Sequence, residues 1–167
     1  MKKRNIIFYL IWLIVLVVFQ PTLFQGIRIF GVSPDMFLVF AVCTGLFRGK
    51  GEGAVVGCIF GFVFDLLVGK SIGISAIIYM YTGFVSGVIR ERFTSDRITV
   101  AAPVLFITAL ISGIIYYVAY NISWKDLGFG IALIRTILPK TLYTAIMGTA
   151  LFIPIRKSFK IIEDKMF

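Results

Sequence analysis

Apolar residues form long runs along this chain, and most charged residues fall between the runs. A helix needs about 20 mainly apolar residues, with a range of about 17 to 25, to cross the hydrocarbon core of a bilayer. Runs close to or above this length predict six transmembrane helices, over about residues 5–24, 32–47, 53–69, 71–89, 98–120 and 128–153. The pattern therefore predicts an all-α integral membrane protein, folded as a compact six-helix bundle.

The second of these segments is the least regular. Its uninterrupted apolar part, residues 36–47, is short, and residues 29–34 are needed to complete a crossing. A re-entrant or tilted segment within residues 21–34 is the alternative.

Composition agrees with a membrane location, because 59% of the 167 residues are hydrophobic and the mean hydropathy is +0.99. The segments between the runs are too short for a soluble domain, so residues 1–167 are expected to form a single transmembrane domain. The basic start followed by an apolar stretch is similar to a signal peptide. It is too long and has no Ala-x-Ala-like cleavage site, so an uncleaved first helix is expected.

The distribution of basic residues predicts the orientation, because short cytoplasmic loops are enriched in Lys and Arg. In the six-span topology most of the 17 basic residues fall on one side: Lys2, Lys3, Arg4, Arg48, Lys50, Arg90, Arg92, Arg97, Arg156, Lys157, Lys160 and Lys165. Both termini are therefore expected in the cytoplasm. The net charge of +9 then reflects topology and contact with anionic lipid headgroups, and nucleic acid is not expected as a partner.

Catalytic chemistry has little support in the sequence. The chain contains no histidine, the commonest general base and metal ligand, and Asp65 is the one carboxylate clearly inside a predicted span. No phosphate-binding loop, zinc-protease motif or nucleophile elbow is found. Cys43 and Cys58 are interpreted as small apolar core residues. No enzymatic activity, cofactor or metal site is expected.

Glycines recur every four residues through the third predicted span. The series runs Gly49, Gly53, Gly57, Gly61, with Asp65 in the next place and Gly69 and Gly73 after it. Such spacing lets helix backbones approach closely in lipid, either within the bundle or with a partner helix. Ser75, Gly83 and Gly87 repeat the pattern in the fourth span, which the turn at residues 70–73 would set antiparallel to the third. A step of four overshoots one helical turn by about 40°, so different glycines are expected to face different neighbours.

An ionisable group inside a membrane usually has a partner in the protein interior. At a rise of about 1.5 Å per residue, Asp65 lies roughly 6 Å, and Arg135 roughly 10 Å, below the outer boundary. We therefore predict a buried ion pair between Asp65 and Arg135, with Lys140 as the alternative cation. Contact of Asp65 with the outer headgroups is the other possibility.

Two features mark the last part of the chain. Pro139 removes the hydrogen bond to the carbonyl of Arg135 and is expected to kink the sixth span. Residues 155–167 place apolar side chains at helical spacing with cations on the other faces, which predicts a helix along the cytoplasmic surface. This tail would anchor the chain in the interface or bind a cytoplasmic partner.

Residues 34–87 resemble the MreD family of bacterial rod-shape membrane proteins. The matching elements are Pro34-Asp35, Arg48-Gly49, the glycine series with Asp65, and the turn at residues 69–73. Outside this stretch the resemblance rests on chain length and topology. It implies a non-enzymatic scaffold of the elongation complex for cell-wall peptidoglycan, which binds MreC and couples MreB filaments to RodA and its class B penicillin-binding partner.

The alternative is the substrate-binding subunit of an energy-coupling-factor vitamin transporter, whose compact bundle of about six helices resembles the fold expected here. Those subunits usually carry an Ala-x-x-x-Ala motif in the first helix. Residues 6–19 contain no alanine, which favours the scaffold.

Overall fold

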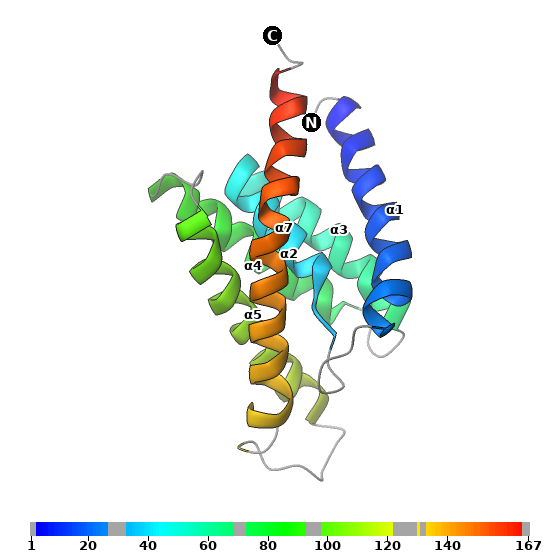
Figure 1. Ribbon diagram of the computed structural model, residues 1–167, viewed down its shortest axis with the longest axis vertical. Helices are drawn as coiled ribbons and strands as arrows, with labels where there is room; N and C mark the ends of the chain where they lie inside the picture. Colours follow the sequence, from blue (N-terminus) through cyan, green and yellow to red (C-terminus); the bar gives the residue numbers. More distant parts are fainter. Residues whose placement is uncertain are drawn as a thin grey trace.

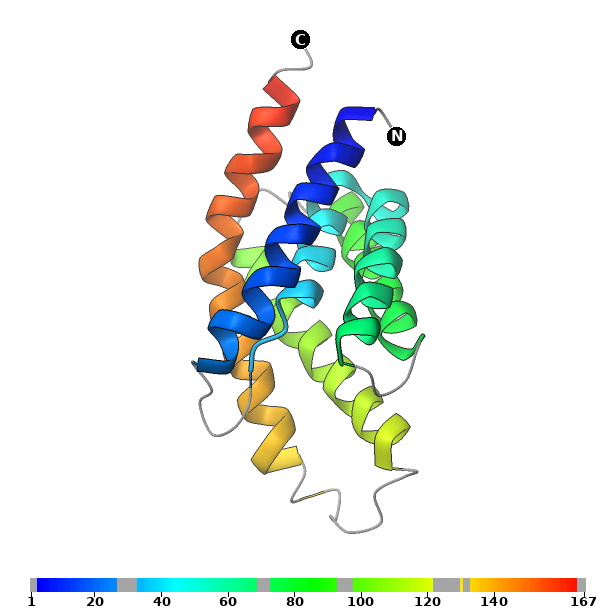
Figure 2. The same cartoon turned by 90° about the vertical axis from the view of Figure 1, so that its right-hand side faces the viewer.

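The computed structural model describes residues 3–26, 33–68, 73–92, 98–121, 130 and 133–164. The described part is all-helical, as the sequence predicts. Its helices are α1 (Lys3–Gly26), α2 (Met36–Arg48), α3 (Lys50–Val68), α4 (Ile74–Arg92), α5 (Ile98–Asn121), the π-helical turn η1 (Leu133–Ile137) and α7 (Leu138–Asp164). The start of α1 and the end of α7 lie at the same end of the bundle (Figures 1 and 2).

Three described segments are long and apolar enough to cross a membrane: Lys50–Val68, Thr99–Ala119 and Leu133–Lys160. Ile6–Val18 and Met36–Arg48 are shorter apolar helices. Each of the six predicted spans corresponds to a helix, and a crossing by all six stays a prediction.

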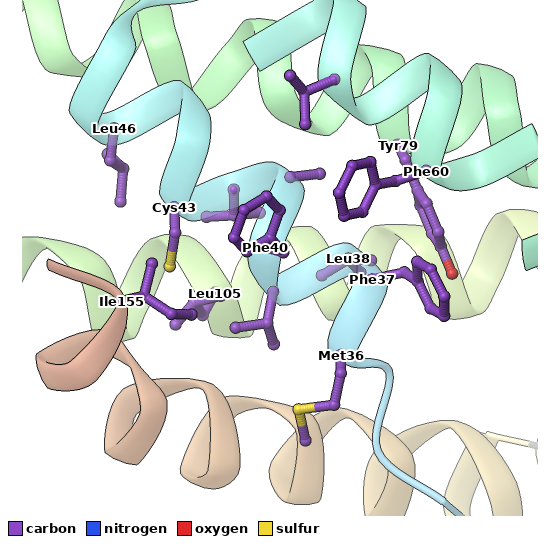
Figure 3. Packing of buried hydrophobic residues seen from close by; sticks show 14 of the residues in the cluster. Met36, Phe37, Leu38, Phe40, Cys43, Leu46, Phe60, Tyr79, Leu105 and Ile155 are labelled. Carbon is purple, nitrogen blue, oxygen red and sulfur yellow. The ribbon is translucent and has the colours of Figure 1, made fainter. Parts of the chain in front are cut away.

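Helix α2 is the centre of the bundle. Its residues from Met36 to Leu46 are all buried, and α3, α4, α5, α7 and α1 contact it. Phe37 packs against Phe60 of α3 with the ring centroids 6.0 Å apart, while Met36 points towards α7 (Figure 3). With 13 residues, α2 is about 20 Å long, shorter than the hydrocarbon thickness of about 30 Å.

The second predicted span, residues 32–47, is thus found as a shorter helix that other helices of the chain surround, and its crossing of the membrane stays a prediction. Asp35 caps its N-terminus, accepting a hydrogen bond of 3.1 Å from the amide of Leu38. Residues 33–35 before it are not helical. In the alternative of a re-entrant segment at residues 21–34, residues 21–26 continue α1, residues 33–34 are not helical, and residues 27–32 lie outside the described residues.

The end of α7 differs from its prediction. Instead of a separate surface helix from residue 155, α7 continues without a break to Asp164. Ile155 and Phe159 are each only 3% exposed, and the Phe159 ring lies 4.9 Å from Phe8 of α1 and 5.3 Å from Phe47 of α2. Ile155 and Phe159, the described part of the apolar face that the sequence assigns to the membrane surface, are therefore buried in the bundle, and Phe159 contacts both α1 and α2.

Pro139 is the second residue of α7, which follows directly on a helical turn of another type. The backbone before it is the π-helical turn η1. A π-helical turn is a local departure from regular α-helix, and the kink expected at Pro139 stays a prediction.

Candidate functional site

Helices α3 and α4 pack backbone to backbone along a line of small residues. A Cβ on Gly57 would overlap the carbonyl oxygen of Tyr79, and one on Gly61 would overlap that of Ser75. Backbone atoms cannot move aside as the end of a side chain can, so only glycine allows this approach. We call this line the glycine seam; it comprises Gly53, Gly57 and Gly61 of α3 and Ser75, Tyr79, Gly83 and Gly87 of α4.

The seam has a single antiparallel register. Gly53 faces Gly83, Gly57 faces Tyr79, and Gly61 faces Ser75, so each step of four along α3 matches a step of four back along α4. Gly53, Gly57 and Gly61 therefore share α4 as a neighbour, although different neighbours were expected for them, and Gly53 alone also meets α2.

A glycine outside the predicted set completes the packing at one end of the seam. A Cβ on Gly53 would lie 2.6 Å from the Cα of Gly45 in α2, and a Cβ on Gly45 would overlap the carbonyl oxygen of Gly83. Three helix backbones meet at this point. Gly45 lies four residues before Gly49, so extending the series backwards identifies it in the sequence.

The other predicted glycines have different roles. Gly49, with φ of +93°, makes the turn between α2 and α3, and Gly73, with φ of +104°, precedes α4. Both lie in the left-handed region that favours glycine. Gly87 packs its backbone against Lys50 at the far end of the seam. Gly69 lies outside the described residues.

Asp65 closes the seam at its outer end. The side chain is 2% exposed, and its oxygens accept hydrogen bonds from the amide of Gly73 at 2.8 Å and from the amide of Ser75 at 3.1 Å. These amides belong to the N-terminus of α4, whose positive dipole end stabilises an anion. Asp65 therefore joins the end of α3 to the start of α4.

The predicted ion pair is corrected by these contacts. Among the described residues the ion pair found is Lys50–Glu91, at 3.2 Å, and Asp65 forms none with Arg135 or Lys140. Arg135 is exposed in η1, and the Lys140 ammonium lies 5.2 Å from the ring centroid of Tyr116. The Asp65 carboxylate is therefore hydrogen-bonded by backbone amides at the start of α4, and not by a cation.

Asp35 is a second buried carboxylate, which the sequence marks only through its family motif with Pro34. Besides capping α2, it accepts a hydrogen bond from the hydroxyl of Tyr79, and its own amide donates to Thr144 of α7 at 3.2 Å. Tyr79 also lies beside the hydroxyl of Tyr116. Asp35 therefore connects α2 with α4 and α7.

A hydroxyl contact links the two carboxylates. Tyr116 of α5 donates to the Ser75 hydroxyl at 2.6 Å, and the Ser75 amide donates to Asp65. Five helices thus contribute to one buried set of polar groups, the outer polar network: Asp35, Asp65, Ser75, Tyr79, Tyr116 and Thr144.

The opposite end of the bundle carries a group of cations that includes Arg48, Lys50 and Arg90. The Arg48 guanidinium lies 5.8 Å from the ring centroid of Phe159, and Arg90 lies next to Gly49. Glu52 accepts a hydrogen bond from Tyr9 at 2.7 Å, which attaches α1 to α3. This arrangement agrees with a cytoplasmic location of this end.

The described residues contain no group of three or more potential ligands that could hold a metal ion, and the cysteines Cys43 and Cys58 are free thiols. In this part of the chain both carboxylates of the network cap helices and are buried. The hydrogen bonds of these carboxylates hold the helices of the bundle in position.

Comparison with known proteins identifies the family. The model of the rod shape-determining protein MreD matches residues 3–162 of the 167 residues. No curated protein and no solved structure matches the chain. Since the match covers nearly the full length, the chain belongs to the MreD family, bacterial membrane proteins that determine rod shape and are not known as enzymes.

Proposed function

We propose that the chain is a non-enzymatic scaffold of the elongation complex in the bacterial inner membrane. It binds MreC, and directly or through MreC it links MreB filaments to RodA and the class B penicillin-binding protein. Six spans with both termini in the cytoplasm are part of this proposal, as is contact with membrane lipids. The family match over residues 3–162 is the observation that carries it.

The physical character of the bundle supports a scaffold. A scaffold has to keep its shape while partners bind, and here the glycine seam, the outer polar network and the aromatic contacts of Phe159 connect the helices. The seam itself is filled by the chain's own helices. A partner helix must therefore bind on the outward faces, where apolar side chains are exposed.

Co-purification tests this function. The chain, solubilised from native membranes in mild detergent, is expected to retain MreC together with the wall-synthesis enzymes. A matched preparation from cells that lack MreC controls for indirect recovery of those enzymes. Recovery of a vitamin and an ATPase module, without MreC, would overturn the scaffold and favour the transporter subunit.

A further inference from the structure

The outward side of α4 carries an apolar stripe with one polar group in it. Ile77 is 57% exposed, Tyr81 61%, Phe84 43% and Val85 44%. These positions follow the spacing of one helical face, opposite the glycine seam. We call Ile77, Tyr81, Phe84 and Val85 the outer face of α4.

The six-span topology proposed above places Tyr81 near the middle of the bilayer. α4 runs alongside α3, one of the segments long and apolar enough to cross, with Ser75 facing Gly61 and Gly87 facing Lys50. Tyr81 is six residues from both Ser75 and Gly87, or about 9 Å along the axis from each. Tyrosine in membrane proteins is enriched at the two interfaces, so this depth is unusual for it.

The hydroxyl of Tyr81 has no hydrogen-bond partner among the described residues, whereas three tyrosines that lie inside the bundle have one. Tyr9 donates to Glu52, Tyr79 to Asp35 and Tyr116 to Ser75. A phenol exposed to hydrocarbon without a partner costs free energy, because acyl chains offer no acceptor and water is absent there.

We propose that the outer face of α4 binds a single transmembrane helix of another protein, and that the helix accepts a hydrogen bond from Tyr81. The inference rests on the scaffold function proposed above and assigns the face of the chain that it uses. At this depth a helix is the structure that can present a Ser, Thr, Asn or Gln side chain, or a carbonyl freed by a kink, to the phenol.

The outward faces of α1 and α5 expose aliphatic side chains among their described residues. On α1 the exposed side chains include Leu10, Ile11 and Ile14, and on α5 they include Ile107 and Ile111. Lipid satisfies aliphatic side chains, so the residues named on α1 and α5 require no hydrogen-bond partner, unlike Tyr81.

Site-specific photocrosslinking tests the assignment. Benzoylphenylalanine is placed at position 81 in the full chain and, as matched controls, at Phe62 on α3 and Ile107 on α5, which are 47% and 55% exposed. The chain is co-expressed with full-length MreC and irradiated in native membranes. The expected result is an adduct with the transmembrane segment of MreC from position 81, at least ten times more abundant than from either control.

The outcomes separate this inference from the proposed function. An MreC adduct from position 62 or 107 but not from 81, or an adduct between two copies of the chain at 81, overturns the α4 face while the scaffold stands. No adduct at 81 in membranes from which the two proteins co-purify overturns it as well. Failure of MreC to co-purify at all overturns the scaffold and this inference together.

Tyr81→Phe removes the hydroxyl alone and keeps the apolar face. It is expected to weaken MreC retention about three-fold, which corresponds to the free energy of an average hydrogen bond between membrane helices. Phe62→Leu on α3 is the control and should leave retention unchanged. Equal retention by Tyr81→Phe and the original chain would contradict the hydrogen bond.

Discussion

At the scale of single residues, the two buried carboxylates are stabilised in the same way. Asp35 accepts from the amide of Leu38 at the start of α2, and Asp65 accepts from the amides of Gly73 and Ser75 at the start of α4. An aspartate at mid-bilayer costs about 2.5–3.5 kcal/mol on insertion scales. Amide hydrogen bonds and the positive end of a helix dipole offset that cost without a cation.

Substitution of Asp65 tests this account. Asp65→Asn loses the charge and leaves one oxygen for two amides, so we expect it to lower the free energy of unfolding by about 1–3 kcal/mol. Arg135→Gln, at an exposed position, is expected to change it by less than about 0.5 kcal/mol. Thermal unfolding in detergent, followed by circular dichroism, measures both. If both variants lost the same free energy of unfolding, the account would be contradicted in favour of the ion pair. Recovery of stability in a variant that exchanges the charges of Asp65 and Arg135 would have the same meaning.

The sequence predicts that Asp65 is buried and needs a partner, but it does not reveal which. Side-chain cations are visible in a sequence, whereas an amide is present at every residue and becomes a partner only where a helix begins. The position of Ser75, directly after the turn, is the one local indication. Asp35 is recognised as part of a motif, and its burial depends on α2 being enclosed, which no local pattern shows.

At the scale of elements, the glycine seam sets the distance between α3 and α4. Helix association in lipid depends on van der Waals contact and hydrogen bonds more than on the hydrophobic effect. Glycines at Gly57 and Gly61 bring one backbone onto the other, so the contact is continuous. Glycines spaced by four residues predict such a packing surface. That α4 is the helix packed against it follows from the short connection between α3 and α4.

Alanine at Gly57 should separate this pair. The added Cβ overlaps the carbonyl of Tyr79, and forcing extra atoms into a packed interface costs about 1–3 kcal/mol. Gly51→Ala is the matched control in the same helix, because its Cβ would meet nothing within 4 Å and alanine is the better helix former. Unfolding midpoints in detergent should therefore fall for Gly57→Ala and stay level or rise for Gly51→Ala. A similar midpoint for the two variants would contradict the seam.

The last turns of α7 should act as part of the core. Phe159→Ala removes the ring that contacts Phe8 and Phe47, and truncating a buried phenylalanine costs about 3–5 kcal/mol. Lys160→Ala, at the exposed neighbouring position, is expected to cost less than about 0.5 kcal/mol. Chymotrypsin cleavage of α1 in detergent offers a second measurement, because α1 contains aromatic cleavage sites such as Phe8 and should loosen in the Phe159 variant. Comparable stability of the two variants would contradict a core role of Phe159 and favour the surface helix predicted from the sequence.

At the scale of the whole molecule, the two ends differ in character. The outer polar network lies at one end, and the cations around Arg48, Lys50 and Arg90 lie at the other. The apolar runs predict the helices well, because a run of such length allows few other structures. They do not separate a helix surrounded by lipid from one surrounded by protein, since both are apolar on every side. This is why α2 is predicted as a full span.

Cysteine labelling tests the six-span topology. Lys50 and Glu91 form an ion pair and must share one side, whereas α5 separates Glu91 from Gly130. With Cys43 and Cys58 replaced by alanine, Glu91→Cys should react with a membrane-impermeant maleimide only in inside-out vesicles, and Gly130→Cys only in intact spheroplasts. Lys50→Cys, the control, should follow Glu91→Cys. Labelling of positions 91 and 130 from the same side would show that α5 does not cross, and the positive end of the bundle would then no longer define the cytoplasmic face.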